Sequence, residues 1–193
     1  MIGDYLRPML RNCFEKITQS GNDFSTKNRF LAPSLQGSCV MVELDTIDCR
    51  ILNALQRAGR MSNAELSERV NLSPSACHRR VQRLESEGVI ANYVALLDPR
   101  KLDRPSTVFV EITLSGQTED ALDAFEREVA LIPDLLECHL MAGTADYLLK
   151  LSARDTDDFA RIHRRYLARL PGVAQMQSSF SLREVFKTTA LPV

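Results

Sequence analysis

Two helix starts stand close together in this chain, and they constrain its fold more than any other feature of the sequence. The first is Ser62-Asn63-Ala64-Glu65, which has the pattern of a capping box. In such a box the Ser and Glu side chains each accept a hydrogen bond from a backbone N–H group that would otherwise be unpaired at the helix start. The second is Ser73-Pro74, a capping residue followed by a proline at the first helical position, where no N–H donor is needed. Because about three residues separate the two helices, we predict a helix-turn-helix motif at about residues 63–82.

A third helix is predicted directly before this pair. Asp45 can cap a helix whose apolar residues recur at helical spacing, namely Ile47, Ile51, Leu52 and Leu55. Asn71 lies in the tight turn between the paired helices, and asparagine is one of the few residues that tolerate a positive φ there. Gly88 is expected to end the last helix. We therefore predict a three-helix domain with its linker over residues 42–104.

The helix after Ser73 has two different faces. At 100° per residue, Cys77, Val81 and Leu84 fall in one narrow stripe, which we expect to face the core. The opposite face is polar, and its first two turns contain no acidic residue. The whole chain has a net charge of -1, so only local positive charge, such as the three arginines within residues 79–83, can attract a polyanion.

The polar face carries the residue types of a DNA-reading helix. When a recognition helix enters the major groove, arginine pairs with guanine, glutamine with adenine, and serine with bases or phosphates. We expect four residues to face the groove: Ser75, His78, Arg79 and Gln82. Arg80 and Arg83, on the two flanks, are expected to reach phosphates. The alternative is a solvated face on an unrelated helical hairpin.

The pattern of apolar residues changes in the second half of the chain. Helices are predicted after the capping residues Thr118 and Thr156. Strands are predicted at residues 107–114, 135–141, 147–153 and 173–182. The resulting order, β-α-β-β-α-β over residues 105–193, is that of a ferredoxin-like α+β sandwich.

Composition excludes several classes of protein. No apolar run approaches the length needed to span a bilayer, and the N-terminus lacks the features of a secretory signal. The five cysteines are scattered without CxxC spacing, which favours reduced thiols in the cytoplasm over disulfides or a zinc site. Residues 1–41 have no sustained period, and we interpret them as a poorly ordered arm. We expect a cytoplasmic protein with no metal, no cofactor and no membrane partner.

An enzyme is one alternative, and the sequence does not favour it. The three histidines, His78, His139 and His163, fall in three different predicted elements. No nucleophile–base motif and no phosphate-binding glycine loop accompanies them. The acidic residues within 155–158 precede a helix, where they suit the helix dipole better than a metal ion. We therefore expect no catalytic activity.

Long stretches of residues 43–186 resemble one family. "LDTIDCRILNALQRAGRMSNAELSERVNLSPSACHRRVQRLESEGVI" is followed in order by "LLDPRKL", "ECHLMAGTADYLLKL" and "LPGV". Together these stretches closely resemble the leucine-responsive/asparagine-related (Lrp/AsnC) family of bacterial and archaeal transcription regulators. The resemblance implies a winged helix-turn-helix domain that binds double-stranded DNA, followed by a ferredoxin-like, RAM-type domain for effector binding and assembly. It also implies homodimers that often build further into octamers.

The resemblance also implies an effector site. In this family a small effector, commonly an amino acid, binds at subunit interfaces beside the turn between the second and third strands of the second domain. That turn maps here to Met141, Ala142, Gly143, Thr144, Asp146 and Tyr147. Free N–H groups of the turn would suit a carboxylate, and Asp146 could pair with an ammonium group. Many family members have Gly-Asp where this chain has Gly143-Thr144, which removes one acid.

Two alternatives to effector binding stay open. Gly143 and Asp146 could serve only to build the hairpin. In that case the protein could be an effector-independent architectural DNA-binding protein, which would use the same helix without a ligand-dependent change.

The predicted sheet also indicates assembly. Helices that cover one face of a four-stranded sheet leave the other face open. Because side chains alternate along a strand, Phe109 is expected on the face opposite to that of Val108 and Val110. An exposed apolar sheet surface usually marks an interface. We therefore expect dimers whose two recognition helices contact half-sites roughly 10 bp, or a multiple of this distance, apart.

Overall fold

A computed structural model describes residues 42–193 and divides the chain into two compact units. The first unit extends to Asn92, and the second comprises Tyr93–Pro192. The predicted arm, residues 1–41, lies outside the described residues. Among the described helices, none combines the length and apolar character that crossing a membrane requires.

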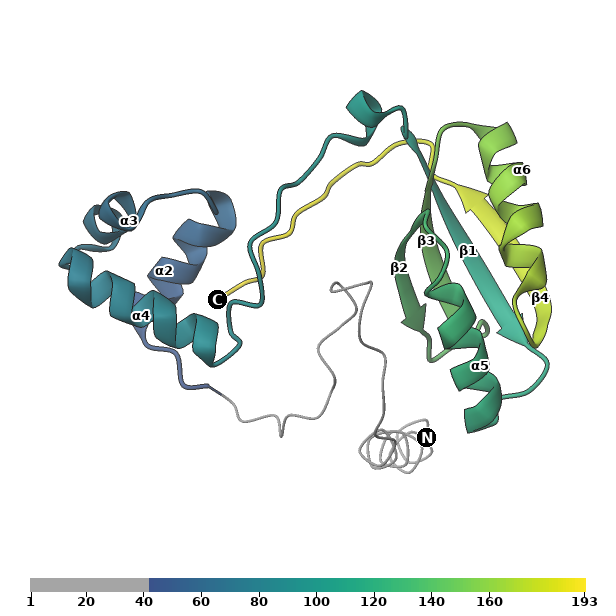
Figure 1. The fold of residues 1–193 in the computed structure, drawn as a ribbon, viewed down its shortest axis with the longest axis horizontal. Helices are drawn as coiled ribbons and strands as arrows, with labels where there is room; N and C mark the ends of the chain where they lie inside the picture. Colours follow the sequence, from purple (N-terminus) through teal and green to yellow (C-terminus); the bar gives the residue numbers. More distant parts are fainter. Residues whose placement is uncertain (1–41) are drawn as a thin grey trace. The chain divides into compact units, whose positions relative to one another are not determined.

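The first unit is a bundle of three helices, and each predicted cap is confirmed. The helices are α2 (Thr46–Arg57), α3 (Asn63–Val70) and α4 (Pro74–Ser86) (Figure 1). Asp45 and Ser62 each form a capping box, and the Ser73 side chain accepts from the N–H of Ala76. Local hydrogen-bonding residues therefore set where each helix begins, as the sequence predicted.

The turn between α3 and α4 depends on one residue in a left-handed conformation. Asn71 has φ 57° and ψ 50°, and its N–H donates back to α3. The turn lets one face of each helix pack inward, so that Ile51, Leu66 and Leu84 are buried in a common core. After α4, residues 91–98 lie in neither a helix nor a strand.

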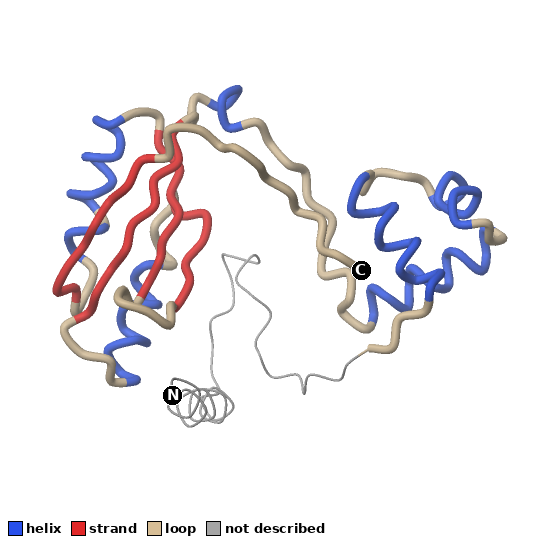
Figure 2. Tube along the Cα trace, turned by 180° about the vertical axis from the view of Figure 1, so that it is seen from behind, coloured by secondary structure: helices blue, strands red, loops and turns tan. Residues whose placement is uncertain are grey.

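The second unit is an antiparallel sheet with two helices on one face. Along the chain it contains β1 (Ser106–Leu114), α5 (Glu119–Val129), β2 (Leu135–Leu140), β3 (Tyr147–Ala153), α6 (Thr156–Arg165) and β4 (Val173–Phe180). The strand order in the sheet is β2-β3-β1-β4, which is the predicted ferredoxin-like arrangement. Opposite views of the sheet show α5 and α6 behind one face and the strands uncovered on the other (Figures 1 and 2).

Alternation along the strands separates a core face from an open face. On β1, Val108, Val110 and Ile112 are fully buried beneath the helices. Phe109 points to the open face, where its partners on the neighbouring strands are Lys150 and Ser179. The open face therefore mixes apolar and polar side chains.

One predicted cap in this unit is wrong. The sequence predicted that Thr156 caps α6, but Asp155 is the capping residue and Thr156 is the first helical residue. The Asp155 carboxylate accepts from the N–H of Asp158 at 2.7 Å while the Asp155 backbone is extended. Both residue types are good caps, so the pattern of residue types did not distinguish them. The predicted Thr118 cap of α5 is confirmed.

Candidate nucleic-acid interface and effector site

The outward face of α4 is open to solvent. Four predicted groove residues, Ser75, His78, Arg79 and Gln82, are exposed, whereas Cys77 and Leu84 on the opposite face are fully buried. Ser75 Oγ lies 3.3 Å from Ser73 Oγ. Within residues 42–193, the side chains of His78, Arg79 and Gln82 form no hydrogen bond or ion pair. Their donors and acceptors are thus available to a partner.

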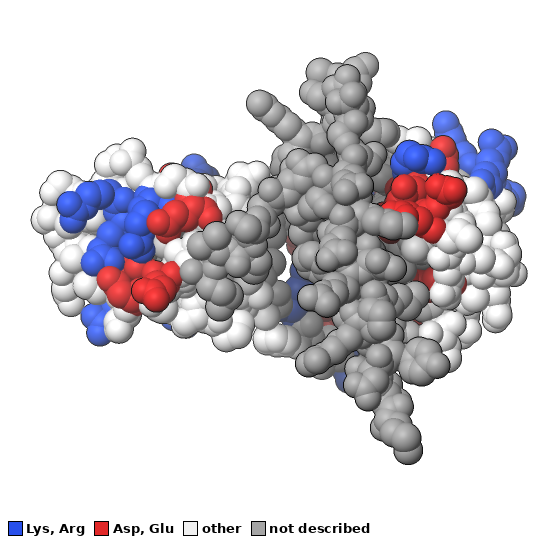
Figure 3. Space-filling model, turned by 90° about the horizontal axis from the view of Figure 1, so that it is seen from below, with Lys and Arg blue, Asp and Glu red and all other residues white. Residues whose placement is uncertain are grey.

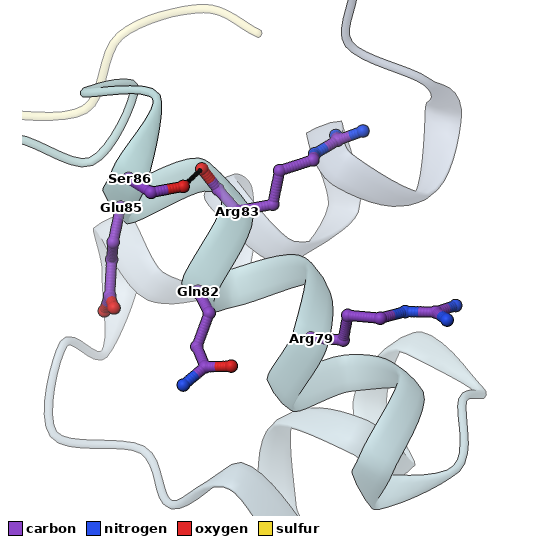
Figure 4. Close-up of a pocket in the computed structure, with 5 residues that line it drawn as sticks. All are labelled: Arg79, Gln82, Arg83, Glu85 and Ser86. Carbon is purple, nitrogen blue, oxygen red and sulfur yellow. Dashed lines mark hydrogen bonds between the residues drawn. The ribbon is translucent and has the colours of Figure 1, made fainter.

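A shallow depression follows the C-terminal part of this face. Its lining residues are Arg79, Gln82, Arg83, Glu85 and Ser86. Arg79 and Arg83 project to one side of α4, and Gln82 and Glu85 project to the other (Figure 4). The Ser86 hydroxyl donates to the backbone carbonyl of Arg83 and so stays at the helix end. On this side, the exposed guanidinium group of Arg79 suits an anionic partner.

The two flanking arginines are already engaged by carboxylates. Arg80 Nη1 lies 2.7 Å from Asp45 Oδ2 and 2.8 Å from Asp48 Oδ1. Arg83 Nη2 lies 2.5 Å from Asp48 Oδ2. That these two arginines contact phosphates stays a prediction. Both guanidinium groups are paired with carboxylates, whereas that of Arg79 has no partner among the described residues. On the visible face of the helical unit, acidic side chains likewise lie directly beside basic ones (Figure 3).

Hydrogen bonding holds the Asp45 carboxylate in its charged form. The backbone N–H of Asp48 and then the Arg80 guanidinium lower the pKa of Asp45 to about 2. The hydrogen bond that Arg80 donates to Asp45, followed by the one that it donates to Asp48, raises the pKa of Arg80. The contact is therefore an ion pair throughout the neutral range.

Asp48 is a functional candidate that the sequence interpretation missed. Its side chain is fully buried, and it accepts from Arg80, Arg83 and the backbone N–H of Asp45. A signal was present, because position 48 falls on the same helical stripe as Ile51, Leu52 and Leu55. An acidic residue on an apolar stripe requires a cationic partner from another element.

The predicted effector turn has an exposed and a buried part. Met141, Ala142, Gly143 and Thr144 are exposed between β2 and β3. Among the described residues, no acceptor is found for the N–H groups of Ala142, Gly143 and Thr144. A Cβ built on Gly143 would meet no atom within 4 Å. The exposed part therefore has both space and unpaired donors for a carboxylate.

The buried part of this turn is occupied by the fold itself. Asp146 accepts from the N–H of Leu114 at 2.7 Å and from Gln117 Nε2 at 2.5 Å. Its carboxylate thus stabilises the end of β1, and an ammonium group would have to compete with both donors. Tyr147 is also buried, and its hydroxyl donates to Glu126 Oε1 at 2.8 Å. Burial, and then the Glu126 carboxylate, raise the pKa of Tyr147 above its usual range.

The remaining histidines and acidic residues were also considered as candidate sites in the sequence. The described side chains include no group of three or more His, Cys, Asp and Glu residues that could hold a metal ion. His139 lies on β2 with its Nε2 3.3 Å from Glu137 Oε2, and His163 packs near the ring of Phe159. These histidines belong to separate environments, as predicted.

The fold and the exposed α4 define a helix-turn-helix protein with a second, ferredoxin-like domain. Residues 44–91 match the family model of winged helix-turn-helix DNA-binding domains, and residues 107–191 match that of the Lrp/AsnC ligand binding domain. The leucine-responsive regulatory protein of Escherichia coli (strain K12) is 44% identical over 151 residues, which are 78% of this chain and 92% of that protein. The chain belongs to the Lrp/AsnC family of transcription regulators.

Solved structures agree with this assignment. A transcriptional regulator from Neisseria meningitidis in complex with L-Met has a TM-score of 0.74 and 39% identity, with 78% of this chain and 97% of that chain covered. An AsnC family regulator from Agrobacterium tumefaciens has a TM-score of 0.74 and 34% identity, with 77% and 97% covered. The chain is thus a DNA-binding regulator with a ligand-binding domain, and it is not an enzyme. The predicted fold class and family are confirmed.

Proposed function

We propose that the exposed face of α4 reads base edges in the major groove of double-stranded DNA. One observation carries this proposal: His78, Arg79 and Gln82 are exposed and lack a partner among the described residues, while the other face of the same helix is buried. Arg79 would pair with a guanine and Gln82 with an adenine, and Ser75 and His78 would contact bases or phosphates. Arg80 and Arg83 keep their predicted place on the flanks, with their charge offset by carboxylates.

The test compares sequence preference in the wild type and in Arg79→Ala. Binding sites are first selected from genomic fragments, and affinities are then measured on a selected site and on a random duplex. We expect Arg79→Ala to lose about 1–3 kcal/mol on the selected site and less on the random duplex, because a base contact is lost. Arg127→Ala, which removes an exposed arginine of α5, should leave the preference unchanged. Equal losses on both duplexes would contradict base reading by Arg79.

We also propose that the exposed turn of the second unit binds the carboxylate of an amino acid. The unpaired N–H groups of Ala142, Gly143 and Thr144 support this proposal. The Neisseria relative was solved with L-Met, and other relatives carry the name leucine-responsive. A panel of amino acids that begins with methionine and leucine is therefore the rational choice. Because the target is chromosomal DNA, we expect the protein to act in the cytoplasm.

Thermal unfolding with each amino acid tests the effector site. A ligand that binds only the folded protein raises the melting temperature, and we expect such a rise for at least one member of the panel. Gly143→Ala should remove the rise without changing the melting temperature of the free protein, because its Cβ meets no atom of the chain. Gly116→Ala, at an equally open glycine, should keep the rise. If no amino acid shifts the melting temperature, the architectural alternative is favoured.

We propose further that the protein acts as a homodimer, from which octamers could be built. Apolar side chains at the surface of the second unit support this proposal. Phe109 lies on the open face of the sheet, and large apolar residues are also exposed in the extended segments 93–97 and 182–186. Such surfaces usually mark an interface. A dimer would present two α4 helices to half-sites roughly 10 bp, or a multiple of this distance, apart.

A further inference from the structure

We infer that Asp48 is a positioning residue that withholds two arginines of α4 from the DNA phosphates and so limits sequence-independent affinity. The inference rests on the proposed function of α4 as the helix that contacts DNA. It assigns to a buried acid of α2 a role in DNA binding, although that acid itself contacts no DNA.

The geometry of Asp48 supports this role. The side chain is fully buried, and its two oxygens point to two different arginines, Oδ1 to Arg80 at 2.8 Å and Oδ2 to Arg83 at 2.5 Å. A hydrogen bond from the backbone N–H of Asp45 to Oδ2, at 3.2 Å, fixes the carboxylate at the start of α2. A buried carboxylate is costly without cationic partners, so the side chains of Arg80 and Arg83 are held against Asp48.

The charge around the two arginines is fully compensated. Asp45 Oδ2 lies 2.7 Å from Arg80, and Glu87 Oε2 lies 3.6 Å from Arg83 Nε, which has no hydrogen-bond partner. Three carboxylates therefore face two guanidinium groups. A phosphate that approaches this flank meets a surface with no excess of positive charge, and it releases few counterions there.

Arg79 differs from its neighbours in this respect. It lies next to Arg80 in the sequence, but it is exposed and has no acidic partner among the described residues. The three arginines of residues 79–83 thus divide into one free cation on the groove-facing side and two that are neutralised by α2. This division favours contacts that depend on the base sequence over contacts that any duplex provides.

The salt dependence of binding to a random duplex tests the inference. The logarithm of the affinity falls linearly with the logarithm of the salt concentration, by about 0.9 for each phosphate that the protein neutralises. Asp48→Asn should steepen this slope by about one and tighten binding roughly threefold at moderate salt, because Arg80 and Arg83 both lose the buried carboxylate that holds them and one of them can then reach a phosphate. A slope equal to or shallower than that of the wild type would overturn the inference.

Two further variants separate released arginines from other effects. Glu43→Gln removes an exposed acid without a partner among the described residues, so it raises the net charge equally but should not change the slope. Asp48→Asn combined with Arg83→Gln removes both members of one pair and should return the slope to the wild-type value. If the double variant is shallower than the wild type by about one, Arg83 contacts phosphates without restraint, and the inference is wrong.

Folding of the variants is checked by thermal unfolding. If Asp48→Asn does not fold, Asp45→Asn repeats the test at an exposed position, because asparagine still caps α2 while one acidic partner of Arg80 is lost. Its slope should also steepen, and an unchanged slope would count against the inference. A wild type that binds no duplex would instead refute the proposed function of α4, so the two failures are distinguishable.

Discussion

Asp146 already has hydrogen-bond partners within the fold. The sequence offered two roles for this residue, pairing with an effector's ammonium group or building the hairpin, and 8% of the residue is exposed. Both carboxylate oxygens already accept hydrogen bonds, one from the Leu114 N–H and one from the Gln117 side chain. The N–H groups of the neighbouring turn are exposed, whereas an ammonium group at Asp146 would have to compete with these two donors.

We expect Asp146→Ala to destabilise the protein by about 1–3 kcal/mol. The substitution leaves the buried N–H of Leu114 without its acceptor, and an unsatisfied buried donor costs about this much. Urea unfolding of the variant and the wild type measures the difference. Asp123→Ala, at an exposed position of α5, is the matched control and should change stability by less than about 0.5 kcal/mol. Equal effects of the two substitutions would contradict the structural role of Asp146.

At the scale of elements, the helix starts were the most predictable part of the fold. Asp45, Ser62, Ser73 and Thr118 were all identified from residue types within four positions of the helix, because capping is a local interaction. The strands were also predicted from local alternation. In contrast, the pairs of Asp48 with Arg80 and Arg83 join residues 32 and 35 positions apart. Contacts between elements depend on packing, so neither pair could be read from local patterns.

In the candidate site too, local patterns were predictable and contacts between elements were not. The exposed face of α4 follows from helical periodicity, which correctly predicted that Cys77 and Leu84 are buried and that Arg79 and Gln82 are exposed. Periodicity alone could not separate the free arginine from the paired ones. That separation depends on where the start of α2 lies against α4, which is a property of the packed unit.

The cap of α2 predicts a pH dependence of stability. Folding lowers the pKa of Asp45 from 3.8 to about 2, so the ionised cap stabilises the folded state above about pH 4. This contribution is lost as the pH falls through the folded pKa, toward pH 2. Asp158, at the start of α6, makes the stability depend on pH in the same direction, because the backbone N–H of Arg154 and the Arg161 side chain lower its pKa to about 2.

We therefore expect Asp45→Asn to lose less stability than the wild type between pH 4 and pH 2. The variant keeps a capping side chain but has no carboxyl group to protonate at this position. Chemical unfolding followed by far-UV circular dichroism at several pH values measures the loss. Glu43→Gln serves as the control and should follow the wild type. A parallel pH dependence of Asp45→Asn and the wild type would contradict the role of the charged cap.

For the whole molecule, we expect the open face of the sheet to take part in the proposed assembly. Phe109 is 37% exposed there, beside Lys150, which pairs with Glu137 at 2.7 Å. An aromatic ring next to charged side chains is a combination that protein interfaces commonly have. If two copies pack through this face, each one removes the Phe109 ring from water and gains the corresponding hydrophobic free energy.

We expect Phe109→Asp to weaken the homodimer at least tenfold, because a carboxylate would be buried at the interface without a partner. Sedimentation equilibrium at several protein concentrations gives the dissociation constants of the variant and the wild type. Leu131→Asp introduces the same charge at an exposed apolar residue between α5 and β2, away from the strands, and should leave the dimer intact. A dimer that tolerates Phe109→Asp as well as Leu131→Asp would place the interface elsewhere, with the exposed segments 93–97 and 182–186 as the next surfaces to test.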